Sequence, residues 1–157
     1  MMANITIRPM TSQDIAAVAN WMVLVPLWQR YHVTVTAAQT QFEQGLKQQD
    51  MLLVADAGSE ARACGFTWCL PKGAFGLSAY LRLIGVRQDQ VGLGIGSALL
   101  AETEHVAAQH SKDMFLLVSD FNTDAQRFYR RHGYEQIGAI AGYVLPHVAE
   151  LIFRKRL

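Results

Sequence analysis

A glycine-rich passage near the middle of the chain, Gly92-Leu93-Gly94-Ile95-Gly96, constrains the fold more than any other stretch. The alternating apolar segment 79–86 before it predicts a strand, and the apolar-periodic segment after it predicts a helix that ends near His110. Glycines at such a junction permit a tight turn and a close approach of the backbone to a ligand. The first N–H groups of the helix lack intrahelical partners and can donate to an anion. The expected ligand is therefore a phosphate or pyrophosphate.

The glycine spacing by itself leaves other interpretations open. No Lys-Ser or Lys-Thr pair follows the glycines, so the passage does not match the phosphate loop of nucleoside triphosphatases. It also lacks the GxGxxG spacing, the position near the chain start and the acidic residue of a dinucleotide fingerprint. A glycine-rich turn with a purely structural role fits the bare pattern equally well.

Hydrophobic periodicity divides the rest of the chain into alternating strands and helices. Strands are predicted over about 5–8, 51–57, 62–70, 79–86, 114–118, 134–143 and 149–154, with turns at 58–59 and 72–76. Helices are predicted to begin at Thr11 or Ser12, Thr36, Gly94 and Asn122, with Pro26 ending the first and Gly133 following the last. The order β-α-α-β-β-β-α-β-α-β-β predicts an α/β (α+β) fold, a mixed sheet of about seven strands flanked by about four helices.

Length and composition exclude several classes of protein. The 157 residues show no repeat and no linker, so one domain over residues 1–157 is expected. Hydrophobic residues make up 51% and charged residues 17%, which excludes a disordered chain. Fourteen Lys and Arg against 13 Asp and Glu give a net charge of +1, so neither nucleic acid nor a membrane is expected as the main partner.

The N-terminal segment and the cysteines predict a cytoplasmic protein. Residues 1–9 lack the apolar block of a signal peptide, and the most apolar stretch, 15–28, is too short to cross a bilayer. Cys64 and Cys69 lie five residues apart in one predicted strand, with Cys64 on the same face as Phe66 and Cys69 on the other. They are expected to remain buried free thiols. The histidines show no ligand spacing, so no metal site is predicted.

Two segments, 86–100 and 118–134, together resemble the GNAT acetyltransferase superfamily. The first resembles the family's acetyl-CoA signature, in which a strand leads to a Gln/Arg-x-x-Gly-x-Gly/Ala turn and a helix. The second is similar to the family's next block, which is matched here by Val118, Asn122, Ala125, Phe128-Tyr129 and Gly133-Tyr134. The opening Ile5-Thr6-Ile7-Arg8-Pro9 followed by Asp14 also looks like the family's usual start, and the predicted element order is similar along essentially the whole chain.

The signature departs from the family pattern at two side chains. Val91 stands at the Gln/Arg position, and Leu93 stands where a basic residue is often found. Side-chain contacts with the pyrophosphate should therefore be weak, which leaves backbone N–H groups as the main anchors.

The resemblance implies an N-acetyltransferase in which a substrate amine attacks acetyl-CoA directly. The backbone of Ile84, Gly85 and Val86 would pair with the pantetheine arm, and the Val86 N–H would polarise the acetyl carbonyl. The pyrophosphate would be held by the turn and the start of the helix: Val91, Gly92, Leu93, Gly94, Ile95, Gly96 and Ser97.

Asn122 and Tyr129 complete the implied cofactor and catalytic set. Asn122 matches the asparagine that hydrogen-bonds the cofactor arm, and its alternative role is a plain helix cap. Tyr129 matches the tyrosine that protonates the leaving thiolate, and a phenol suits this role because its reference pKa is about 10. From spacing alone, a core aromatic beside Phe128 is an equally good interpretation of Tyr129.

The acceptor side is the least defined part of the prediction. Trp28 and Tyr31 lie where family members build one wall of the acceptor cleft, although they could equally pack on the sheet. Tyr80 and Arg82 share a strand face, from which Arg82 could hold a substrate carboxylate or form a surface ion pair. The acceptor is expected to be a small-molecule or peptide amine, and the resemblance also allows a homodimer.

The general base is not assigned, because the strand 79–86 contains no acid. Asp120 and Glu150 are the options, and both are expected to be solvated surface charges. This gap, with Val91 and Leu93, keeps a second hypothesis open, a CoA-binding module without turnover that acts as a sensor or partner protein. A third, a dinucleotide- or phosphate-binding α/β protein, leaves the Asn122 and Tyr129 block unexplained.

Overall fold

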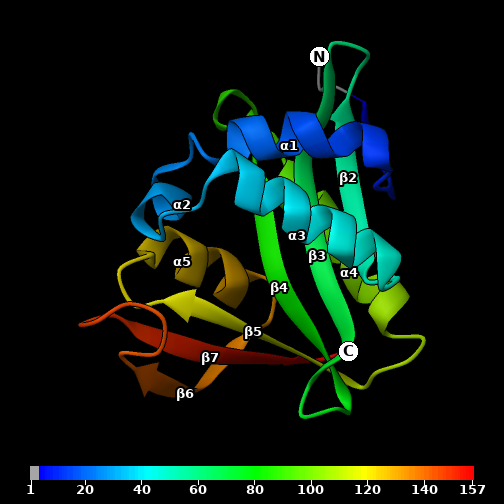
Figure 1. Cartoon of the computed structure of the whole chain (residues 1–157). Helices are drawn as coiled ribbons and strands as arrows, with labels where there is room; N and C mark the ends of the chain where they lie inside the picture. The colour runs from blue at the N-terminus through cyan, green and yellow to red at the C-terminus, as the bar shows by residue number, and fades with distance from the viewer. Residues whose placement is uncertain (1–3) are drawn as a thin grey trace. The chain divides into compact units, whose positions relative to one another are not determined.

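The computed structural model describes residues 4–157, so the first three residues of the N-terminal segment lie outside the described residues. Within the described range there are seven strands, five α-helices and two short 3-10 helices (Figure 1). The strands are β1 (Ile5–Pro9), β2 (Met51–Ala57), β3 (Ala61–Ala74), β4 (Ser78–Val86), β5 (Asp113–Ser119), β6 (Glu135–Ala141) and β7 (Ala149–Arg156). The helices are α1 (Ile15–Met22), α2 (Pro26–Arg30), α3 (Val35–Lys47), α4 (Ile95–Ala107) and α5 (Thr123–Arg131).

The strands form one mixed sheet in the order β1-β2-β3-β4-β5-β7-β6, which confirms the predicted fold class. Strands β4 and β5 are parallel, whereas β1 with β2, β2 with β3, β5 with β7 and β6 with β7 are antiparallel. The ladder between β4 and β5 joins only three residue pairs, from Ala79↔Met114 to Leu81↔Leu116. Strand β4 nevertheless continues to Val86.

The chain divides into two compact units. Unit 1 contains the chain up to Cys69 together with Leu83–Val106, and unit 2 contains Leu70–Arg82 and Ala107–Leu157. No helix within residues 4–157 is long and apolar enough to cross a membrane.

In unit 1, helices cover both faces of the sheet. Helices α1 and α3 lie on one face and α4 on the other (Figure 1). Beneath α1 and α3, Trp21, Trp28 and Phe66 form a cluster of tilted rings with centroids 5.7–6.4 Å apart. Beneath α4, Ile95 and Leu99 pack on small and aliphatic side chains of β2 and β3. Burial of these two faces fixes the position of β4 and of the start of α4.

An ion-pair cluster joins β1 and β2 to the start of the first helix. Arg8 donates hydrogen bonds of 2.8 Å to both Asp14 and Asp56. Asp14 also accepts the Thr11 N–H at 2.8 Å, and Asp56 accepts the Ala63 N–H at 2.7 Å. The bonds from Arg8 lower the pKa of Asp14. Burial alone would raise the pKa of Asp56, but the bonds from Arg8 and Ala63 outweigh it and lower that pKa.

In unit 2, helix α5 packs on the sheet through a cluster of aromatic rings. Tyr129 of α5 lies edge-on to Tyr134, with ring centroids 5.7 Å apart, and to Phe153 of β7, at 6.3 Å. The predicted ends of this helix are confirmed. Asn122 Oδ1 accepts the Ala125 N–H at 3.2 Å, and Gly133 follows the helix with a φ of +89°, the left-handed region that glycine favours.

Three predicted boundaries near helices and turns are wrong in detail. The cap of α3 is Thr34, whose Oγ1 accepts the Ala37 N–H at 3.2 Å, and not Thr36. Pro26 starts the additional helix α2 as its first residue, a position that needs no N–H donor, while α1 has already ended at Met22.

The second predicted turn is shorter than expected. Strand β3 runs on to Ala74, and a two-residue turn with positive φ at Phe75 and Gly76 brings the Leu77 N–H to Ala74 O at 3.1 Å. Strand β5 is fully buried on one face only: Met114 is fully buried, whereas Phe115 is half-buried.

Both cysteines are buried free thiols, but the prediction that they lie on opposite faces is wrong. Cys64 packs with residues of α4 and not beside Phe66. Thr67 bonds a threonine of α4 at 2.8 Å, so strand alternation places Cys69 on the α4 side as well. The cause is an irregularity in β3, where Ala63 has a φ of +47° and the register with β2 shifts.

Candidate active site

The glycine turn before α4 has the conformation that its sequence suggests. Gly92 and Gly94 have φ values of +83° and +84°, and a Cβ on either would meet no atom within 4 Å. Glycine is therefore needed here for backbone conformation and not for lack of space. The first intrahelical bond of α4 runs from the Ala98 N–H to Gly94 O at 3.0 Å, so the N–H groups of Ile95 and Gly96 precede it. The positive end of the helix dipole faces the same side.

The side chains of this turn contribute little to the binding of an anion. Val91 is 64% exposed and Leu93 is 50% exposed, and both are apolar. The neighbouring cation, Arg87, donates two hydrogen bonds, of 2.6 and 3.0 Å, to Asp89. This pairing raises the pKa of Arg87 and lowers that of Asp89. That a phosphate at this turn is held mainly by backbone groups stays a prediction, with which these side chains are compatible.

The side chains at the end of strand β4, just before the turn, pack against other residues of unit 1. Ile84 and Val86 are partly buried on the α4 side, and Leu83 packs on the opposite side. At Gly85 the Trp28 ring lies over the backbone, where a Cβ would come 2.2 Å from it. Trp28 is only 6% exposed, so the structure places this predicted substrate contact in the core of unit 1.

Tyr31 and Arg82 occupy more open positions than Trp28. Tyr31 is half-buried directly after α2, and Arg82 is exposed on β4. Each makes contacts of its own within the folded chain. The structure therefore leaves the predicted contacts of these two side chains with a substrate as predictions.

The Tyr129 side chain is buried although its hydroxyl group has no hydrogen-bond partner among residues 4–157. The residue is 6% exposed, and its ring is enclosed by other aromatic rings. No fully buried polar side-chain atom of the described chain lacks a partner, so the Tyr129 hydroxyl retains some accessible surface. Burial and the nearby Tyr80 raise the pKa of Tyr129 well above its ordinary value. The phenol therefore stays protonated at neutral pH.

Asn122 lies at the junction of β5 and α5. Its side-chain oxygen is engaged by the Ala125 N–H, and the Gln126 amide donates to the carbonyls of Ser119 and Asp120 at 3.1 and 3.0 Å. These bonds fix the turn after β5. The cap uses the side-chain oxygen of Asn122 and not its amide nitrogen. Capping and cofactor binding are therefore compatible roles for this residue.

Of the two carboxylates considered as a base, one is not a surface charge. Asp120 is exposed and accepts the Ala149 N–H at 3.0 Å. Glu150 is only 5% exposed, which contradicts the prediction that it is solvated. The available signal was its position between apolar residues in a strand, Ala149-Glu150-Leu151. That pattern cannot tell which face of the strand a neighbouring element covers.

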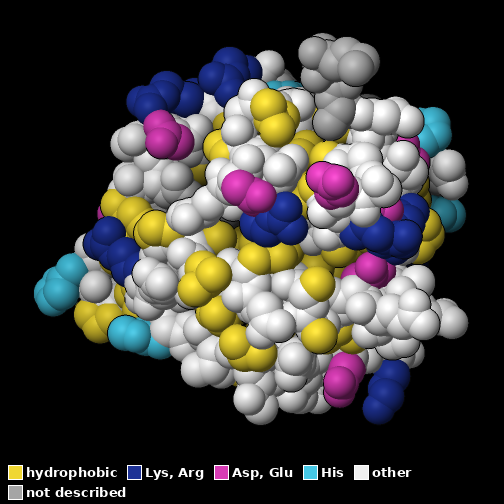
Figure 2. Space-filling model, turned by 90° about the horizontal axis from the view of Figure 1, so that it is seen from above, with side chains coloured by type: hydrophobic (Ala, Val, Ile, Leu, Met, Phe, Trp, Pro, Cys, Tyr) yellow, Lys and Arg dark blue, Asp and Glu magenta, His cyan; other side chains and the backbone are white. Residues whose placement is uncertain are grey.

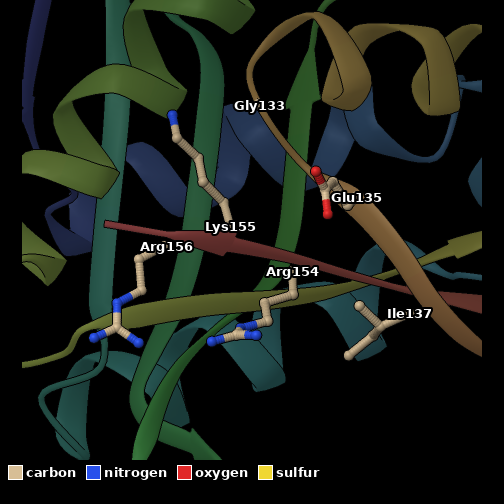
Figure 3. Close-up of a pocket in the computed structure, with 6 residues that line it drawn as sticks. All are labelled: Gly133, Glu135, Ile137, Arg154, Lys155 and Arg156. Carbon is tan, nitrogen blue, oxygen red and sulfur yellow. The ribbon is translucent and has the colours of Figure 1, made fainter.

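A separate shallow groove lies where β6 begins, and none of the predicted site residues line it. It is lined by Gly133, Glu135, Ile137, Arg154, Lys155 and Arg156. Figure 3 shows Arg154 and Arg156 extending to one side of β7 and Lys155 to the other. Arg154 is paired with Asp113 at 2.8 Å. On the molecular face shown in Figure 2, acidic and basic side chains are mixed and do not form a patch of one sign.

Comparison with known proteins agrees with the arrangement of these elements. The model of the Acetyltransferase (GNAT) family matches residues 15–134. No curated protein sequence is significantly similar to the chain.

Solved acetyltransferase structures are similar over nearly the whole chain. Ribosomal-protein-alanine N-acetyltransferase from Brucella melitensis superposes with a TM-score of 0.77 at 20% identity, covering 97% of this chain and 99% of that one. An N-acetyltransferase from Staphylococcus aureus Mu50 gives 0.80 at 16% identity, covering 98% and 99%. The protein yncA from Salmonella typhimurium, solved with its cofactor acetyl-CoA, gives 0.76 at 14% identity, covering 98% and 94%.

Proposed function

The chain belongs to the acetyltransferase (GNAT) family, and from this premise we propose that it transfers an acetyl group from acetyl-CoA directly to a small-molecule or peptide amine. Acetyl-CoA supplies an activated acetyl group as a thioester. The observation that carries the proposal is the Tyr129 hydroxyl, which is protonated and has no protein partner in residues 4–157. A protein that only bound CoA would not need an acid of this kind.

In this proposal, unit 1 supplies the groups that hold the cofactor. The N–H groups from Val91 to Ser97 bind the pyrophosphate with the help of the α4 dipole. The backbone of Ile84, Gly85 and Val86 binds the pantetheine arm as an additional strand would. Support comes from the β4–β5 ladder, whose described pairs end at Leu81 while β4 continues to Val86.

In the proposed reaction, different residues act in different steps. The amine nitrogen forms a bond to the acetyl carbon, and the Val86 N–H stabilises the negative charge that develops on the acetyl oxygen. The carbon–sulfur bond then breaks, and Tyr129 donates its proton to the leaving sulfur. The nitrogen loses a proton as the amide forms, and this proton restores Tyr129. Asn122 binds the cofactor arm through its amide.

A CoA-binding module without turnover is the second candidate function. It is favoured by one observation, the two exposed apolar side chains of Val91 and Leu93 in the turn. Weak side-chain anchoring is compatible with a sensor that releases CoA readily. Turnover distinguishes this candidate from the first.

The test is steady-state release of free thiol from acetyl-CoA with a panel of small amines and N-terminal peptides. We expect Tyr129→Phe to lower kcat by about 100-fold or more, because general acids contribute 10²–10⁴-fold. Its stability should change little, since the lost hydroxyl makes no described hydrogen bond. Tyr134→Phe is the matched control, a buried tyrosine whose hydroxyl contacts the Met114 sulfur at 3.2 Å. Equal rates for Tyr129→Phe and the unmodified enzyme would refute the acid role. If acetyl-CoA binds but no acceptor in the panel leads to thiol release, the result would favour the CoA-binding module without turnover.

A further inference from the structure

The turn between β3 and β4 carries the two most exposed large apolar side chains of the described residues. Phe75 is 85% exposed and Leu77 is 75% exposed, and only Gly76 separates them in sequence. The next most exposed large apolar side chains, Leu24 and Val91, are 64% exposed. The acetyl transfer proposed above uses neither Phe75 nor Leu77, so the exposure of this pair needs a separate explanation.

Neither the backbone nor the packing of the turn explains a phenylalanine at position 75. Phe75 and Gly76 have φ values of +59° and +67°, and two-residue turns of this kind favour Asn-Gly because a bulky side chain is disfavoured at positive φ. The Phe75 ring lies edge-on to the ring of Phe115, with centroids 5.5 Å apart. It remains 85% exposed all the same, so this contact orients the ring and buries little of it.

Exposed cations lie at the same end of the unit 2 sheet as this turn. Strand β5 is parallel to β4 and antiparallel to β7, so the first residues of β4 and β5 meet the last residues of β7 (Figure 1). Two hydrogen bonds join this end of the sheet: the Ala79 N–H donates to Ser111 Oγ at 3.0 Å, and the Leu157 N–H donates to Lys112 O at 2.8 Å. The exposed cations here are Lys72, Lys112 and Arg156.

These three cations form no ion pair within residues 4–157. Of the acids nearby, Asp113 is bonded to Arg154 at 2.8 Å, and Glu135 is exposed at the start of β6. Unit 2 as a whole has nine Lys and Arg against five Asp and Glu, whereas unit 1 has five against eight. The net charge of +1 for the whole chain therefore conceals an excess of positive charge in unit 2.

The size and the chemistry of the exposed pair favour a lipid surface over other partners. Two side chains of this kind can bury only about 300 Å², whereas each partner of a stable protein interface contributes about 800 Å². A single-stranded nucleic acid would stack on Phe75 but would leave Leu77 without a role. The interface of an anionic bilayer accepts both apolar side chains and attracts Lys and Arg, and it requires no surface of complementary shape.

We propose that this turn binds the surface of an anionic phospholipid bilayer. Phe75 and Leu77 enter the headgroup region, and Lys72, Lys112 and Arg156 are attracted to the lipid phosphates. The association is peripheral and reversible, and salt weakens it because the charges are exposed. It is independent of the proposed acetyl transfer, since none of these five residues belongs to the proposed cofactor or catalytic set.

The experiment is co-sedimentation of the full chain with phosphatidylcholine vesicles that contain either no phosphatidylglycerol or about 30% of it. We expect binding to the anionic vesicles only, and weaker binding at high salt. The double variant Phe75→Asn with Leu77→Ser should lower the partition coefficient by about tenfold or more, because it removes the apolar contacts with the bilayer. Lys112→Gln and Arg156→Gln should each lower it by about fivefold.

Two controls separate a lost contact from a damaged fold. Asparagine suits the positive φ at position 75, so the double variant should unfold at about the same temperature as the unmodified protein. Leu24→Ser removes an exposed leucine of unit 1 and should leave vesicle binding unchanged.

Several results would overturn the proposal. The unmodified protein could fail to bind anionic vesicles, or the double variant could bind them equally well. Binding of an oligothymidylate that the double variant loses, without vesicle binding, would assign the turn to nucleic acid instead. Self-association in sedimentation velocity that the double variant loses, again without vesicle binding, would assign it to a second copy of the chain.

Discussion

Replacement of Gly85 by alanine should destabilise the protein strongly, although it adds a single methyl group. The added Cβ would lie 2.2 Å from one carbon of the Trp28 ring, 2.9 Å from a second, and 3.0 Å from Phe66. The Trp28 ring is 6% exposed and is enclosed by Trp21 and Phe66, so it cannot move aside without disturbing the core. Overpacking of this kind costs about 1–3 kcal/mol, and the 2.2 Å approach to a rigid ring favours about 3.

The assay is urea unfolding followed by far-UV circular dichroism, with thermal unfolding as a second measurement. For a chain of this length about 3 kcal/mol corresponds to a fall of about 6–12 °C in the unfolding midpoint. Gly138→Ala is the control, because its Cβ would meet only Ile152 at an ordinary 3.5 Å, and a change within about 0.5 kcal/mol is expected. The double variant with Trp28→Leu should be less destabilised than the sum of the single variants, by about 1 kcal/mol or more. A Gly85→Ala protein as stable as the unmodified one, or strict additivity, would refute the reasoning.

Three further predictions concern the Arg8 cluster and the glycine turn. Arg8→Gln should cost about 2–3 kcal/mol at pH 7, since it leaves Asp14 and Asp56 without their cation. Because Arg8 lowers both pKa values, its stabilisation is present above the unfolded-state pKa of about 3.9 and is lost as the pH falls through the folded-state values. Acid titration of stability should therefore be shallower in Arg8→Gln, and identical slopes would contradict this account. Val91→Arg should tighten acetyl-CoA binding by about 1 kcal/mol, roughly fivefold in Kd by calorimetry, and an unchanged Kd would argue against a pyrophosphate there. Gly94→Ala should weaken the same binding, because alanine costs about 1–2 kcal/mol at a φ of +84°; unaltered affinity would show that this conformation is not needed.

Sequence signals that act over a few residues predicted the helix ends and the order of the strands correctly. The cap at Asn122 and the glycine at Gly133 are short-range features, and both are where the sequence placed them. The seven strands and the order of the elements followed from hydrophobic periodicity, because each element buries one face. The error at Thr36 arose because Thr34 has the same capping chemistry two residues earlier, and only the fold selects between them.

Features that depend on packing between distant segments could not be predicted. The face of Cys64 was wrong because a bulge at Ala63 breaks the alternation that the prediction assumed. Trp28 was considered for a substrate pocket, yet its ring covers Gly85, a contact between residues 57 positions apart in sequence. Burial of Glu150 likewise depends on the neighbours of β7, which no local pattern specifies.

The central claim, that the turn before α4 holds acetyl-CoA in a working acetyltransferase, is tested most directly by thermal unfolding with 1 mM acetyl-CoA, about 1 mM NAD or no ligand. A ligand that binds only the folded protein must raise the midpoint, by about 2.7 kcal/mol at 100 times its Kd. For a chain of this length that stabilisation corresponds to a rise of about 5–11 °C. The account predicts a clear rise with acetyl-CoA and none with NAD. No rise with acetyl-CoA, or an equal rise with NAD, would contradict it.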